Sequence, residues 1–171
     1  MFSSSTLTLL LILTFSSITF SCSSQLSFAQ NPTSSSLLPA GSFVKSFEQL
    51  VNQAHNLTQS YQNEVTKWRT HQFDNKTMIS IINDYIPKYE NLVNQSKTLQ
   101  PPKQFQNATN VYTKSLESEL QSNIHFKNYV STNNSTENKL SSQFLQEAAN
   151  DEFDAFKALA PSGIFAFVPG R

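Results

Sequence analysis

From Phe43 onward, apolar residues recur every three or four positions, which is the spacing of one face of an α-helix. The first apolar face predicts a helix over residues 43–70 and consists of Phe43, Phe47, Leu50, Ala54, Leu57, Tyr61, Val65 and Trp68. The second consists of Met78, Ile82, Tyr85, Tyr89, Leu92 and Leu99. The chain therefore begins its patterned part with two long amphipathic helices.

The second helix has a recognisable start and an internal proline. Asp74 precedes it and can accept hydrogen bonds from the first backbone N–H groups as an N-cap. Pro87 lies within the apolar face, where it removes one backbone hydrogen bond and crowds the preceding turn. Because the apolar spacing continues across Pro87, we expect one kinked helix rather than two.

Two further helices follow the Pro101-Pro102 break. The third has the apolar face Phe105, Ala108, Tyr112, Leu116, Leu120 and Ile124, and it fades near Val130. Residues 131–136 predict a turn, in which Asn134 and Glu137 resemble a capping box. The fourth helix has the apolar face Leu140, Phe144, Ala148, Phe156 and Leu159.

These segments predict an all-α fold. Every glycine lies outside them, and no Asn-Gly or Asp-Gly pair favours a β-hairpin. Short connections favour antiparallel neighbours, so we expect an antiparallel up-down four-helix bundle with coiled-coil packing over residues 43–160. In the apolar C-terminal tail 161–171, we expect Ile164–Val168 to fold back onto an open end of the bundle, with a partner-docking peptide as the alternative.

The N-terminal part is typical of an exported chain. No charged residue occurs before Lys45, and the apolar run Leu7–Phe20 is shorter than the about 20 residues that span a membrane. Small residues at Ser27 and Ala29 predict cleavage after Ala29. We therefore expect a signal peptide over 1–29 and a flexible Ser/Pro-rich spacer over 30–42.

Two features leave a membrane tether as the alternative. No Lys or Arg precedes the apolar run, which is consistent with a segment 1–29 that is retained as an anchor. Cys22, the single cysteine, follows Ser21 as a lipid-attachment cysteine would, although the residues before Ser21 fit that signal poorly. We expect Cys22 to leave with the signal peptide, so that the mature chain contains no disulfide.

Charge and composition narrow the class of protein. Twelve Lys and Arg balance twelve Asp and Glu, which argues against nucleic-acid binding. Neutral Ser, Thr, Asn and Gln make up 69 of the 171 residues. Six Asn-x-Ser/Thr acceptors occur, and Asn75, Asn133 and Asn134 are the best placed for glycosylation because they lie in predicted breaks between helices.

The sequence lacks the common motifs for catalysis and cofactor binding. It contains no Gly-x-Ser-x-Gly elbow, and the residues three positions before His55, His71 and His125 are not glutamates, so the Glu-x-x-His motif of di-iron bundles is absent. His71 and Asp74 alone supply too few ligands for a metal. We therefore expect no catalytic residue, cofactor or metal site.

Acidic residues of the fourth helix are candidates for interaction. Glu147, Asp151 and Asp154 share one face, which is either solvated, a weak cation site or a patch for a basic partner. Glu152 instead falls between Ala148 and Phe156 on the apolar face. A buried carboxylate needs a partner, so Glu152 is expected either to hold the helices in register or to contact a ligand.

Short motifs within and between the predicted helices resemble those of one group of proteins. The resemblance rests on Tyr89-Glu90-x-Leu92, Leu99-x-Pro101-Pro102, Tyr112-x-x-x-Leu116 and the run from Glu147-Ala148-Ala149 to Glu152 and Phe156. In these features residues 43–156 resemble uncharacterised secreted helical domains of archaeal and bacterial envelopes. The Ser-Phe-Ala-Gln junction and low charge also resemble exported proteins of ammonia-oxidising archaea. The resemblance implies an exported location and a helical fold but no activity.

We therefore expect an exported, non-catalytic helical-bundle protein of the cell envelope or extracellular space, with a binding or structural role. It would contact another protein or a surface glycan through exposed aromatic or acidic helix faces. The alternative is a protein that binds a small molecule or metal ion, in an aromatic cleft near the tyrosines or on the acidic face of the fourth helix.

Overall fold

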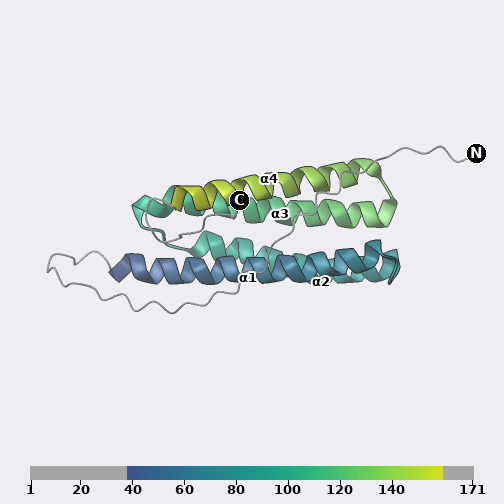
Figure 1. Cartoon of the computed structure of the whole chain (residues 1–171), viewed down its shortest axis with the longest axis horizontal. Coiled ribbons are helices and arrows are strands. Elements are labelled where there is room, and N and C mark those ends of the chain that lie inside the picture. The colour runs from purple at the N-terminus through teal and green to yellow at the C-terminus, as the bar shows by residue number, and fades with distance from the viewer. Residues whose placement is uncertain (1–37, 160–171) are drawn as a thin grey trace, which may run out of the picture. The chain divides into compact units, whose positions relative to one another are not determined.

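The computed structural model describes residues 38–159, which form four α-helices and one short 3₁₀ helix and contain no strand (Figure 1). The elements are α1 (Leu38–Arg69), α2 (Asn75–Thr98), η1 (Lys103–Phe105), α3 (Gln106–Thr132) and α4 (Ser135–Leu159). The prediction of an all-α fold is confirmed for these residues. The predicted signal peptide 1–29 and the apolar tail 161–171 lie outside the described residues.

α1 begins at Leu38, inside the segment 30–42 that was expected to be a spacer. Pro39 is compatible with this start, because the first turn of a helix does not use its backbone N–H groups. The helix ends at Arg69, after which His71 has a left-handed φ of 59°. The backbone N–H of His71 donates to the carbonyl of Trp68, which satisfies one of the last carbonyl groups of the helix.

α2 has the predicted cap and continues through its proline. The carboxylate of Asp74 accepts a 2.8 Å hydrogen bond from the backbone N–H of Thr77. Pro87 is exposed and lies inside the single helix Asn75–Thr98. The helix ends before Leu99, and Pro101 and Pro102 separate it from η1.

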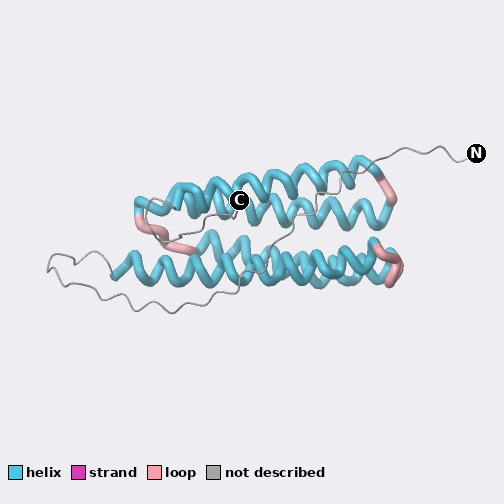
Figure 2. The backbone as a smooth tube through the Cα atoms, viewed as in Figure 1, coloured by secondary structure: helices cyan, strands magenta, loops and turns pink. Residues whose placement is uncertain are grey.

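Only Asn133 and Asn134 connect α3 to α4 (Figure 2). Asn133 has a left-handed φ of 55°, and the side-chain oxygen of Asn134 accepts a hydrogen bond from the backbone N–H of Thr136. The predicted capping box is wrong in its second half. Glu137 does not reach back to Asn134, because its carboxylate binds His125 Nδ1 at 2.8 Å and Asn128 Nδ2 at 3.0 Å.

Helices that are neighbours in sequence also pack against each other: α1 on α2, α2 on α3, and α3 on α4. α1 additionally reaches α3 through aromatic contacts, with ring centroids 5.1 Å apart for Phe47 and Tyr112 and 5.5 Å apart for Trp68 and Phe126. α1 and α4 have hardly any close backbone contact. The largest fully buried side chains are Tyr89, Tyr112, Phe47, Met78, Ile82 and Leu159.

Small residues lie between α3 and α4. The hydroxyl of Ser115 donates to the carbonyl of Ala148, and that of Ser122 donates to the carbonyl of Ser141, both at 2.8 Å. These short side chains let the two backbones approach closely while keeping the buried hydroxyls hydrogen-bonded. Among residues 38–159, no helix has both the length and the apolar character needed to cross a bilayer.

Candidate binding site in the helical interior

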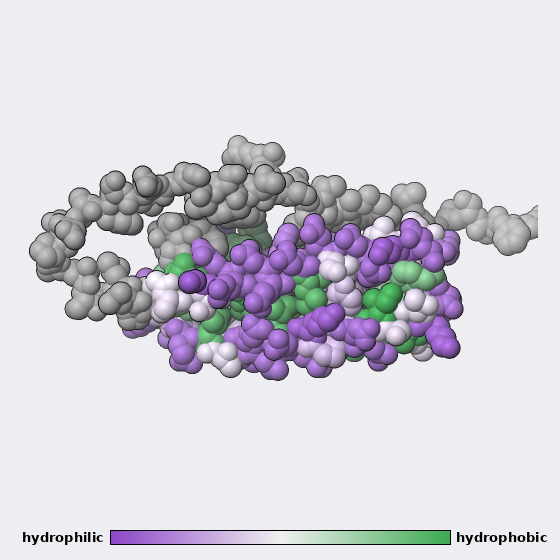
Figure 3. All heavy atoms as spheres, turned by 90° about the horizontal axis from the view of Figure 1, so that it is seen from below, coloured by the Kyte–Doolittle hydropathy of each residue, from purple (hydrophilic) through white to green (hydrophobic). Residues whose placement is uncertain are grey.

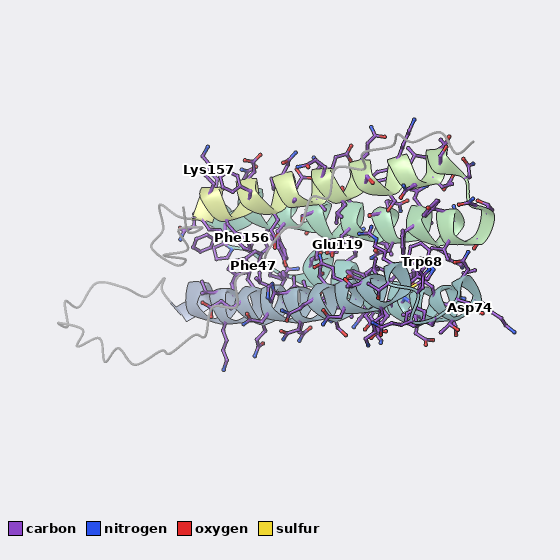
Figure 4. The ribbon with its side chains drawn as sticks, turned by 45° about the vertical axis from the view of Figure 1, so that its right-hand side comes forward. Phe47, Trp68, Asp74, Glu119, Phe156 and Lys157 are labelled. Atoms are coloured by element: carbon purple, nitrogen blue, oxygen red, sulfur yellow. The ribbon has the colours of Figure 1, made fainter. Side chains whose placement is uncertain are left out.

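Glu119 lies on the buried face of α3. It is three residues after Leu116 and four before Asn123, both of which are buried, so all three point to the same side of the helix. Figure 4 shows Glu119 between the pair α3 and α4 and the pair α1 and α2. Its side chain is partly buried. A carboxyl group therefore occupies a position where the helical pattern calls for an apolar residue.

A chain of hydrogen bonds joins Glu119 to α1 and α2. The hydroxyl of Thr58 donates to Glu119 Oε1 at 2.6 Å, and the hydroxyl of Tyr89 donates to Thr58 Oγ1 at 3.3 Å. Thr58 is on α1 and Tyr89 is on α2, so three helices contribute to this chain. Glu119 is the acceptor at its end.

Glu152 brings a second carboxyl group from α4. Burial raises the pKa of Glu152. Burial also raises the pKa of Glu119 to about 7; the hydrogen bond from Thr58 opposes the rise, while the charge of Glu152 adds to it. Within residues 38–159, no Lys, Arg or His forms an ion pair with either group. The charge of Glu152 thus acts on Glu119 without a compensating cation that pairs with either group in the described chain.

Two further polar groups near Glu119 have no hydrogen-bond partner among the described residues. They are the hydroxyl of Tyr61 and the amide nitrogen of Asn123, and each residue is only 5% exposed. The ring of Tyr61 lies 6.1 Å from that of Tyr89, and burial together with the charge of Glu119 raises the pKa of Tyr61. An unsatisfied buried polar group costs about 1–3 kcal/mol.

The residues around Glu119 form what we call the interior polar cluster: Thr58, Tyr61, Tyr89, Glu119 and Asn123. The helices α1, α2 and α3 contribute to it. It offers one carboxyl group, several neutral oxygens and unmet hydrogen-bonding capacity. Chemically, such a cluster can exchange a proton near neutral pH.

The sequence pointed to Glu152 but missed the interior polar cluster. The structure places Glu152 partly buried on α4, where its charge acts on Tyr112 of α3. Glu119, Thr58 and Asn123 were not singled out. For Glu119 and Asn123 the helical spacing of α3 was informative. Steps of three and four residues back from Val130 and Phe126 pass through Asn123 and Glu119 before they reach Leu116.

Asn75, predicted as a glycosylation acceptor, also connects three helices. It is exposed and begins α2. Its side-chain oxygen accepts a 2.9 Å hydrogen bond from the indole N–H of Trp68 on α1, and its nitrogen donates to the carbonyl of Val130 on α3 at 3.1 Å. The other two predicted acceptors, Asn133 and Asn134, are exposed in the turn between α3 and α4.

The remaining candidates stay apart. On α4, Glu147 and Asp154 are exposed and Asp151 is partly buried, and His71 is exposed after α1. In the part of the chain that the structure describes, no three His, Cys, Asp or Glu side chains come together as metal ligands. Of the aromatic residues that could line the expected cleft, Tyr61, Tyr89 and Tyr112 are buried in the core. Trp68, Tyr85 and Tyr129 pack against that core.

No protein-family model, curated protein or solved structure matches the chain at a significant level.

Proposed function

We propose that this chain is an exported, non-catalytic helical-bundle protein that binds a partner at or outside the cell surface. The uncharged N-terminal part, with its apolar run Leu7–Phe20 and the small residues before Gln30, supports export. Residues 38–159 then form the binding module. The partner we favour is another protein, with a surface glycan as the second candidate.

We also propose that the four helices run up and down in alternation. Contacts between α1 and α2 support this course, because Ser60 pairs with Tyr85 and the earlier residue Thr58 with the later residue Tyr89. The Ser115–Ala148 and Ser122–Ser141 hydrogen bonds support the same for α3 and α4. For α2 and α3, the bonds Asn75–Val130 and Lys97–Glu117 have the same antiparallel order.

The observation that carries the binding role is the surface of α4. Leu145 and Phe153 are 42% and 54% exposed, and they are the large hydrophobic residues found exposed within the described chain. They are eight residues apart, so they lie about two turns from each other on neighbouring sides of one helix. By contrast, the face in Figure 3 is mostly hydrophilic, with apolar residues only in an interrupted strip.

The acidic residues of α4 add a charge preference. Glu147 and Asp154 are exposed on the same helix, away from the side that carries Leu145 and Phe153. A partner that covers Phe153 and extends around α4 therefore gains from basic groups at its edge. This combination of apolar centre and basic rim is more typical of a protein surface than of a neutral glycan.

The binding role is tested with the envelope fraction of the protein's own host. We expect the purified chain to co-sediment with that fraction and the double variant Leu145→Ser/Phe153→Ser to lose most of this binding. Gln143→Ser, an exposed polar change on the same helix, is the matched control and should bind as the wild type does. Loss of binding after protease treatment of the envelope identifies a protein partner, whereas loss after glycosidase treatment identifies a glycan. Undiminished binding by the double variant contradicts the proposal.

Export is tested separately by the intact mass of the protein recovered from host medium and envelope. We expect a species that begins at Gln30. A species that retains residues 1–29, or that carries a lipid on Cys22, contradicts a cleaved signal peptide and indicates a membrane tether.

A further inference from the structure

The first and last helices of the bundle are bridged by an aromatic side chain of α3. The ring centroid of Tyr112 lies 5.1 Å from that of Phe47 on α1 and 5.8 Å from that of Phe156 on α4. Close backbone contact between α1 and α4 is nevertheless almost absent. Figure 4 shows Phe47 and Phe156 in the space that separates α1 from the pair α3 and α4. At this level, α1 and α4 therefore border each other without direct helix packing.

Two valines extend this apolar strip along α1. Val44 lies three residues before Phe47 and Val51 lies four residues after it, so the three share one face of the helix, and both valines are partly buried against the core. Ser60, which pairs with Tyr85 of α2, is nine residues from Val51 and so lies on the opposite side of α1. We call this strip the α1–α4 seam, and it consists of Val44, Phe47, Val51, Tyr112 and Phe156.

The side chains at the seam are deeply buried although the two outer helices do not pack on each other. Phe47 is 1% exposed, and Leu159, one turn after Phe156, is 2% exposed. Burial this complete calls for an apolar cover on the side where α1 and α4 do not meet.

The chain itself supplies such a cover just after α4. Residues 164–168 read Ile-Phe-Ala-Phe-Val, carry no charge and begin five residues after Leu159, where α4 ends. Five residues span at most about 18 Å, so this segment stays close to the end of α4 and hence to Phe156. Between them, Pro161 does not continue a helix, and Gly163 permits a reversal of chain direction.

The length and pattern of the segment also fit the seam. Five extended residues cover about 17 Å, which exceeds the about 11 Å of helix between Val44 and Val51. In an extended chain Phe165 and Phe167 point to the same side, so two rings reach an aromatic surface together. Because a short tether gives an effective concentration in the millimolar range, the segment competes well with a free partner for this surface.

We propose that segment 164–168 lies as an extended strap over the α1–α4 seam, with Phe165 and Phe167 directed toward Phe47 and Phe156. The strap joins the last helix to the first and closes the bundle along its side rather than at its end. Phe153 is not part of the seam, so the inference is independent of the proposed partner surface on α4.

Thermal unfolding of the full chain tests the strap. Phe165→Ser/Phe167→Ser should lower the Tm by about 5–10 °C, because two phenylalanines lose their buried apolar area. Ala166→Ser lies in the same segment but points away from the seam, and as the matched control it should stay within about 2 °C of the wild type. The double variant should still bind the envelope fraction, since Leu145 and Phe153 are intact. An unchanged Tm in the double variant overturns the proposal, whatever the outcome of the envelope experiment.

A photo-crosslinker at position 165 locates the segment even if the double variant folds poorly. Benzoylphenylalanine in place of Phe165 should crosslink within one chain to residues 44–51 of α1 and to α4 near Phe156, as identified by peptide mass spectrometry. Three results overturn the proposal: crosslinks between two copies, which indicate a dimer; crosslinks that miss both helices; or a double variant with wild-type Tm that no longer binds the envelope, which identifies a docking peptide for a partner.

Discussion

At the scale of single residues, Asn75 has two potential uses that compete. Its amide nitrogen donates to the carbonyl of Val130, and the same nitrogen would carry a glycan if the Asn75-Lys76-Thr77 acceptor were modified. A glycosylated amide keeps one N–H, but the attached sugar needs room beside α3. The hydrogen bonds of Asn75 to two other helices therefore favour a structural role at this acceptor, and leave Asn133 and Asn134 as the more accessible acceptors.

A pair of substitutions separates these roles. Asn75→Ala loses both side-chain hydrogen bonds, and we expect it to lower the free energy of unfolding by about 1–3 kcal/mol. Thr77→Ala destroys the same acceptor but keeps Asn75 and the backbone N–H that binds Asp74, so it should change stability by less than about 0.5 kcal/mol. Urea unfolding of protein made in a non-glycosylating host measures both. Equal effects would show that Asn75 does not join the helices energetically.

At the scale of elements, the sequence predicted which segments are helical better than it predicted the faces that they bury. Apolar spacing and the Asp74 cap predicted all four helices, because both signals are local. In α3 the expected face ran through Leu120 and Ile124, whereas the structure places Glu119 and Asn123 toward the interior. Which polar residues are buried depends on partners such as Thr58, which is 61 residues away, and no local pattern contains that information.

Pro87 lowers the stability of α2 without a compensating contribution to the core. It is exposed, so its ring contributes little to the core, yet it removes one hydrogen bond inside a continuous helix. We expect Pro87→Ala to raise the free energy of unfolding by about 1–3 kcal/mol. Glu90→Ala, also exposed on α2, is the comparison and should stay within about 0.5 kcal/mol of the wild type. Destabilisation by Pro87→Ala, measured by urea unfolding, would mean that packing depends on the proline.

At the scale of the whole molecule, the interior carboxyl groups make stability depend on pH. Folding raises the pKa of Glu119 to about 7 and also raises that of Glu152, so the folded chain holds these protons more tightly than the unfolded chain does. Their stabilising effect is complete below the unfolded pKa near 4.5 and is lost as the pH rises toward 7 and above. Asp74 and Glu137 act oppositely, because hydrogen bonds lower their pKa values and their contribution is lost in acid.

We therefore expect greatest stability near pH 5 and a loss of roughly 2–3 kcal/mol between pH 5 and pH 8. Glu119→Gln should flatten most of this loss, since glutamine does not titrate. Urea unfolding at a series of pH values measures the effect, with Glu147→Gln as the control that should retain the wild-type profile. A wild-type stability that rises from pH 5 to pH 8 would contradict the assignment.

The two-residue connection at Asn133 and Asn134 bears on the order in which the chain folds. Closing a short loop costs little entropy, and the α3–α4 hairpin already contains internal hydrogen bonds such as Ser122–Ser141, so it is the natural nucleus for folding. This nucleus follows α1 and α2 in the sequence. A chain that crosses a membrane with its N-terminus first would deliver α1 and α2 before the hairpin on which they pack. Such a chain would remain incompletely folded during translocation, and it would complete its fold only after α3 and α4 have emerged.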